Sequence, residues 1–142
     1  MFHPIPPSSA LFVTAVMSAP LGSLAADLHV EVTGVEVGTG AVKLGLFNHA
    51  VGFPSAPVAG QHAIATARTI TAVFRDLAPG VYAVIAFQDK NGNDILDRNL
   101  LGIPTESYGF SRDATGFMGP PSFDGAKVTL TGDIETVTVT LR

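Results

Sequence analysis

The chain has 142 residues, no cysteine and a formal net charge of −4, and its length is that of one domain. The lack of cysteine excludes disulfides, thiolate zinc sites, a cysteine nucleophile and a lipid-modified cysteine anchor. The acidic balance, with eight Lys and Arg residues scattered singly, argues against nucleic acid as a partner, because such binding needs a clustered basic face.

The N-terminal part differs in composition from the rest. The first 26 residues carry no Asp, Glu, Lys or Arg, and a mostly apolar run, Ala10–Ala19, is followed by Pro20 and small residues. This order is typical of a secretory signal peptide, and the run is shorter than the about 20 apolar residues of a membrane-spanning helix. We therefore predict a signal peptide at residues 1–25, a single β-sandwich domain at residues 26–142, no transmembrane segment, and a periplasmic or secreted location. Cleavage one residue later is equally consistent with the pattern.

The remainder has the pattern of β-strands. Apolar and polar residues alternate with a period of two in the segments Leu28–Val32, Val42–Leu46, Ile70–Phe74, Val128–Leu130 and Ile134–Leu141. Val81–Phe87 is apolar on both faces, which predicts a central strand. Turn residues separate these segments, and no window shows an amphipathic helix. The pattern predicts an all-β fold, an Ig-like or prealbumin-like antiparallel β-sandwich of about seven strands with a long structured loop.

That long loop is the segment Gly102–Gly125, which is rich in Gly, Pro and Ser but carries four aromatic rings: Tyr108, Phe110, Phe117 and Phe123. A loop of this length in a compact domain is usually functional or packed on itself. One interpretation is that the rings plug one end of the core. The other is that they form a candidate binding surface for a partner protein or a glycan.

The segment from Asp89 to Asp97 concentrates metal-binding chemistry. Asp89, Asn91, Asn93 and Asp97 place side-chain oxygens at its first, third, fifth and ninth positions, and Ile95 offers a backbone carbonyl at the seventh. This spacing lets a short loop surround a hard cation such as Ca²⁺. We predict a structural calcium site at these five residues.

The same segment departs from an EF-hand in three respects. Asp94 stands where an EF-hand has Gly, Leu100 stands where it has the bidentate Glu, and no helices flank the loop. Asp94, Glu106 or water could supply the missing ligand, and we expect a weak site of about 10⁻⁴–10⁻³ M. The alternative is a metal-free turn, because Asn91-Gly92 is by itself a strong hairpin signal.

Several short motifs in a fixed order carry a family resemblance: Gly45-Leu46-Phe47, Gly52-Phe53-Pro54, Phe74–Val84, Asp89–Asn99, Gly102–Glu106, Tyr108–Ser111 and Gly119–Phe123. Their order closely resembles a family of small exported bacterial proteins catalogued as domain of unknown function twenty-one forty-one. The resemblance covers about Leu28 to Leu141 and implies no established activity.

A second resemblance concerns the fold. Leu77-Ala78-Pro79-Gly80-Val81-Tyr82 looks like the turn of prealbumin-like and collagen-adhesin B-type sandwich domains, and that resemblance implies a structural or binding role. We also expect the Tyr82 hydroxyl to bond the backbone, as in a tyrosine corner.

Catalytic motifs are weak. The histidines His29, His49 and His62 lack metal-ligand spacing, and Ser111 has no base nearby in sequence. Glu106 and Asp113 could form a carboxylate pair for glycoside chemistry. We predict a non-catalytic exported protein with a binding or structural role at the cell envelope, its partner an unknown envelope protein or glycan. The alternatives are a small-ligand or glycan module that uses the aromatic loop, and an unrecognised hydrolase.

Overall fold

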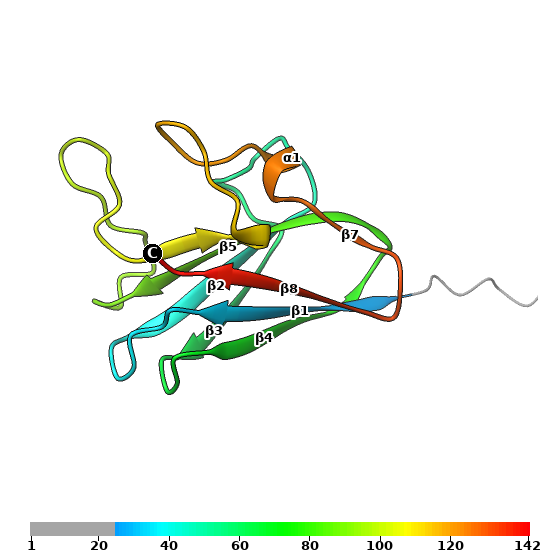
Figure 1. Cartoon of the computed structure of the whole chain (residues 1–142), viewed down its shortest axis with the longest axis horizontal. Coiled ribbons are helices and arrows are strands. Elements are labelled where there is room, and N and C mark those ends of the chain that lie inside the picture. The colour runs from blue at the N-terminus through cyan, green and yellow to red at the C-terminus, as the bar shows by residue number, and fades with distance from the viewer. Residues whose placement is uncertain (1–24) are drawn as a thin grey trace, which may run out of the picture.

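The protein is a sandwich of two β-sheets in the computed structural model, which describes residues 25–142 (Figure 1). The predicted signal peptide lies outside the described residues apart from its last position. The strands are β1 (Ala26–Thr33), β2 (Ala41–Phe47), β3 (Ala59–Ile64), β4 (Ile70–Leu77), β5 (Gly80–Asp89), β6 (Tyr108–Phe110), β7 (Val128–Leu130) and β8 (Ile134–Thr140). A 3-10 turn, η1 (Ser111–Asp113), and one short helix, α1 (Phe123–Ala126), lie between β6 and β7. The predicted all-β sandwich is confirmed.

The two sheets differ in size. The smaller has the order β4-β1-β8, and the larger has the order β3-β2-β5-β6, with β7 pairing the start of β5. β5 thus has neighbours on both sides, which confirms the central strand predicted for Val81–Phe87. In the described part of the chain no helix is long and apolar enough to cross a membrane.

The main core lies between the sheets. It contains the inward side chains of the alternating segments: Leu28, Val30, Val32, Val42, Leu44, Leu46, Phe74, Val84, Leu130, Val137 and Val139. Full burial of each large apolar side chain contributes about 1.5–3 kcal/mol relative to exposure. The period-two pattern therefore predicted correctly which face of β1, β2, β4 and β8 is buried, except that Ile134 at the start of β8 is exposed.

One ladder differs from the predicted antiparallel arrangement. β1 and β8 run parallel, in register from Asp27 opposite Ile134 to Thr33 opposite Thr140. β8 follows β7, which belongs to the other sheet, so the chain crosses between sheets and is not constrained by a hairpin. Alternation predicts the buried face of a strand, but not the direction of its neighbour.

Tyr82 fulfils its prediction. Its ring is in the core, and its hydroxyl donates to the carbonyl oxygen of Ala78 at 2.6 Å. This bond fixes the turn that leads into β5, the strand on which the candidate site is built.

Candidate binding groove

The outer face of the larger sheet is covered over only part of its area. Phe47, Ala83 and Phe110 lie in a second core cluster, together with Phe123 and Ala126 of α1 and with Phe53 from the loop at residues 48–58. The Phe53 ring is 5.1 Å from that of Phe47 and 5.8 Å from that of Phe123. Two of the four rings of the predicted binding surface, Phe110 and Phe123, are thus core residues.

The rest of this face is open and forms a groove of about 910 Å³, which we call the binding groove. Its floor is made by Gly45 of β2, Ile85 and Phe87 of β5, and Tyr108 of β6. All four are only partly buried. Tyr108, the third ring of the predicted surface, therefore borders the groove.

Two loops flank the binding groove. Loop A comprises residues 90–107, and loop B comprises residues 114–122. Loop A contributes Ile95, Leu101 and Ile103, and loop B contributes Met118 and Pro120. Figure 1 shows both loops projecting from the same side of the sandwich. Phe117, the fourth predicted ring, is exposed in loop B and does not line the groove.

Loop B is anchored at its start by Ser111. The Ser111 hydroxyl accepts a hydrogen bond from the backbone N–H of Val84 at 2.9 Å and donates to the carbonyl of Ala126 at 2.6 Å. The next carboxylate, that of Asp113, accepts from the backbone N–H of Thr140 at 2.7 Å. Both side chains connect backbone segments that are far apart in the sequence.

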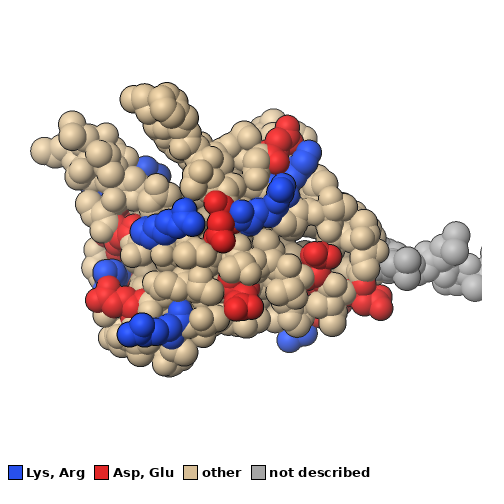
Figure 2. Space-filling view, in the orientation of Figure 1, with Lys and Arg blue, Asp and Glu red and all other residues tan. Residues whose placement is uncertain are grey.

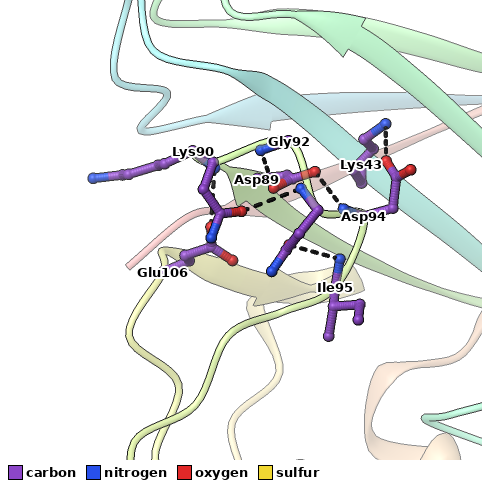
Figure 3. Close-up of polar contacts among 9 residues, drawn as sticks. Lys43, Asp89, Lys90, Gly92, Asp94, Ile95 and Glu106 are labelled. Atoms are coloured by element: carbon purple, nitrogen blue, oxygen red, sulfur yellow. Dashed lines mark hydrogen bonds and ion pairs between the residues drawn. The ribbon is translucent and has the colours of Figure 1, made fainter.

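Loop A is held by two carboxylates that bind backbone N–H groups (Figure 3). Buried Asp89 accepts from the N–H groups of Gly92 and Asp94, each at 2.9 Å. Buried Glu106 accepts from the N–H of Lys90 at 2.9 Å and from that of Asp97 at 3.1 Å. Burial of these charges is tolerated because each is bonded to N–H donors.

The other predicted calcium ligands bond to one another. The amide groups of Asn91 and Asn93 donate to the two Asp97 carboxylate oxygens at 2.6 and 2.7 Å. The amide oxygens accept from the backbone N–H groups of Asn93 and Ile95. The structure thus brings Asn91, Asn93 and Asp97 together. It directs the Asp89 carboxylate to backbone N–H groups and places the Ile95 side chain at the binding groove.

Within residues 25–142, no three His, Asp or Glu side chains gather in a way that suits a metal ion. Calcium binding stays a prediction, because a cation in loop A would have to replace bonds that the loop makes internally.

An ion pair links loop A to the sheet. The Lys43 ammonium lies 2.6 Å from the Asp94 carboxylate, and its hydrogen bond and charge hold the pKa of Asp94 below the usual 3.8. Asp94 has a positive φ of 62°, a conformation that Asp and Asn tolerate better than most residues. Asp94 was identified from the sequence as the residue that stands where an EF-hand has Gly. Nothing in the sequence indicated that Lys43 would pair with it.

The histidines come from separate places: His29 from β1 of the smaller sheet, His62 from the edge strand β3, and His49 from the loop after β2. His49 accepts a hydrogen bond from the backbone N–H of Val51 at 3.0 Å.

These features define an all-β sandwich with an apolar groove on one sheet face. The model of the family described as "uncharacterized protein conserved in bacteria" (DUF2141) matches residues 30–138, and the chain belongs to this family. The family resemblance seen in the sequence is confirmed. No curated protein and no solved structure matches the chain, so the likeness to prealbumin-like and collagen-adhesin domains stays a prediction.

Proposed function

We propose that this protein is a non-catalytic binding module that works outside the cytoplasm and holds an apolar ligand, such as a long acyl chain, in the binding groove. The observation that carries the proposal is the incomplete cover of the larger sheet. Phe47 and Phe110 are buried under other rings, whereas Ile85, Phe87 and Tyr108 on the same face are left partly open.

The size and shape of the groove support this proposal. Its volume of about 910 Å³ lies within the roughly 300–1,000 Å³ of small-molecule sites. Exposed apolar surface of this kind commonly marks a binding site, because leaving it in water costs free energy. The flanking loops would cover a ligand on two sides.

The chemistry of the lining favours an apolar ligand over a glycan. The side chains with polar atoms in the lining are Ser55, Asp94, Arg98 and Tyr108. Asp94 is paired with Lys43, and the Arg98 guanidinium donates to the carbonyl of Gly102 at 3.0 Å. A sugar needs a partner for each hydroxyl that it buries, and the floor residues Ile85 and Phe87 offer none.

A non-catalytic role is supported by how the candidate catalytic groups are used. Ser111 is fully buried and bonded to Val84 and Ala126, and Glu106 and Asp113 accept bonds from backbone N–H groups. A nucleophile or general base must reach the substrate. The signal-peptide pattern at residues 1–25 supports action at the envelope, where a Ca²⁺ ion in loop A would stiffen one side of the groove.

The test is a titration of the protein with a fluorescent long-chain fatty acid. The variant is Phe87→Ser in the groove floor, and the control is Val81→Ser, on the same strand but outside the groove. We expect saturable binding that weakens about tenfold in Phe87→Ser, the scale expected for one buried aromatic side chain, and is unchanged in Val81→Ser. The proposal fails if the parent protein shows no saturable binding or if Phe87→Ser binds equally well. Binding of glycans in place of acyl chains would favour the glycan alternative.

A further inference from the structure

The outer ends of loops A and B each present two adjacent, large apolar side chains. In loop A these are Leu100 and Leu101, with relative exposures of 106% and 83%. In loop B they are Phe117 and Met118, with 94% and 91%. Figure 2 shows two protrusions whose outer ends carry no acidic or basic side chain.

The tip of loop A is a well-bonded turn. The N–H of Gly102 donates to the carbonyl of Asn99 at 2.9 Å, so that Leu100 and Leu101 are the two central residues. The Asn99 side chain accepts from the N–H groups of Leu101 and Ile103 at 2.9 and 3.0 Å. Central turn positions usually carry Gly, Pro, Asn or Asp, so turn formation does not account for two leucines.

The tip of loop B is also constrained by its own backbone. The chain returns so closely that a Cβ atom on Gly116 would lie 2.3 Å from the carbonyl oxygen of Gly119 and 2.4 Å from that of Pro120. Met118 has a positive φ of 56°. The exposure of Phe117 and Met118 therefore belongs to a defined loop conformation.

Each tip has an arginine near its base. Arg98 precedes the turn of loop A, and Arg112 of η1 precedes loop B; both are exposed. Among residues 25–142, the ion pairs are made by Lys43, Arg75, Lys90 and Lys127, so neither arginine has a carboxylate within 4.0 Å. Arg98 donates to the carbonyl of Gly102 and Arg112 to that of Lys127, but both acceptors are neutral, so each positive charge can still attract a negatively charged group outside the protein.

We infer that the two tips insert into the interface of an anionic lipid bilayer, with Arg98 and Arg112 at the level of the lipid phosphates. Apolar side chains inserted below the headgroups, with cations beside them, are the usual chemistry of interfacial binding. A fluid bilayer can accept two separate tips on either side of an open groove, whereas a protein partner would need a surface of matching shape. Because the net charge is −4, we expect apolar insertion to contribute more than long-range attraction.

The tips and the groove share Leu101 and Met118, but they can be tested separately. Leu100 and Phe117 do not line the groove, so both can be changed without removing a lining side chain. The double variant Leu100→Ser/Phe117→Ser should therefore retain acyl-chain binding, and the two proposals can fail separately.

The first experiment is co-sedimentation of the full chain with vesicles of phosphatidylcholine and phosphatidylglycerol. Residues 1–24 are the same in every variant and cancel in the comparison. We expect Leu100→Ser/Phe117→Ser to bind about a hundredfold more weakly, since each residue loses a transfer worth about tenfold. The control Ile134→Ser removes an exposed apolar side chain at the start of β8 and should bind like the parent. Equal binding of the double variant and the parent would overturn the inference and leave a protein partner as the occupant.

A second experiment measures how deeply the two tips insert into the bilayer. Because the chain has no cysteine, single cysteines at Leu100, Phe117 and the exposed control position Thr138 can each carry an environment-sensitive fluorophore. On vesicles, the labels at 100 and 117 should shift to the blue and be quenched by spin-labelled acyl chains, and the label at 138 should not. Arg98→Gln/Arg112→Gln should lose the preference for anionic over neutral vesicles. Tip labels that stay in water, or a preference that persists without both arginines, would contradict the inference.

Discussion

The carboxylate of Glu106 accepts a hydrogen bond from the backbone N–H of Asp97, 3.1 Å away, and its other oxygen accepts one from Lys90 at 2.9 Å. One buried side chain at the end of loop A thus fixes the start and the middle of the same loop. The sequence suggested Glu106 as a source of a missing metal ligand and as half of a carboxylate pair with Asp113, whereas its contacts identify it as the residue that closes the loop.

We expect Glu106→Ala to lower the free energy of unfolding by about 2–3 kcal/mol, because two N–H groups lose a charged acceptor. Glu106→Gln keeps one oxygen and should cost about half as much. Urea denaturation measures both values. Glu31→Ala, on the exposed face of β1, is the control and should stay within about 0.5 kcal/mol of the parent. A Glu106→Ala protein as stable as Glu31→Ala would contradict the assigned role.

The two hydrogen bonds of the Ser111 hydroxyl predict that this side chain stabilises the fold and takes no part in ligand binding. Ser111→Ala should lower the free energy of unfolding by about 1–3 kcal/mol, because the N–H of Val84 and the carbonyl of Ala126 lose their shared partner. The same variant should leave acyl-chain binding in the groove unchanged at temperatures where it is folded. Unchanged stability in a calorimetric melt would show that the hydroxyl contributes nothing to the packing of loop B.

The sequence was sufficient for the core and the central strand, and insufficient for the edge strand β3. Alternation at Leu28, Val30 and Val32 predicted β1 because one face is buried and the other is not. β3 escaped prediction because it is an edge strand held through backbone pairing to β2, and its Gln61 and His62 side chains are exposed. Strands without a buried face leave no periodic signal.

The candidate site was predictable only in part. Phe110 and Phe117 belong to the same Gly- and Pro-rich segment, yet one is buried and the other exposed. The difference arises because Phe110 pairs with Ile85 across β6 and β5, which places its ring against the sheet face. Likewise, the spacing from Asp89 to Asp97 correctly marked a cluster of oxygens, but the N–H groups of Gly92 and Asp94 that bind Asp89 follow from the folded loop.

Calcium should stabilise the protein weakly if it binds loop A. The amide groups of Asn91 and Asn93 would have to turn over to offer oxygen in place of nitrogen to a cation beside Asp97, and this would break the bonds to Asn93 N and Ile95 N. With a dissociation constant of about 1 mM, about 10 mM Ca²⁺ adds about 1.4 kcal/mol. We expect a rise in Tm of roughly 4–8 °C. Asp97→Asn should lose it. An unchanged Tm of the parent at that concentration would exclude the site.

The ion pair between Lys43 and Asp94 should stabilise the protein near neutral pH and lose its contribution in acid. Lys43 lowers the pKa of Asp94 from 3.8, mainly through its hydrogen bond and then through its charge. A carboxyl whose pKa is lower in the folded state stabilises the fold above the unfolded pKa, and this contribution is lost as pH falls below 3.8 through the folded value. The stability difference between the parent and Lys43→Gln should therefore be constant near neutral pH and disappear in acid.

NMR titration should show the Asp94 pKa rising in Lys43→Gln. Lys90→Gln is the matched control, because Lys90 lowers the pKa of Glu36 instead. It should raise the pKa of Glu36 and leave that of Asp94 in place. A stability difference that persists in acid would mean that Lys43 acts through packing rather than through its charge.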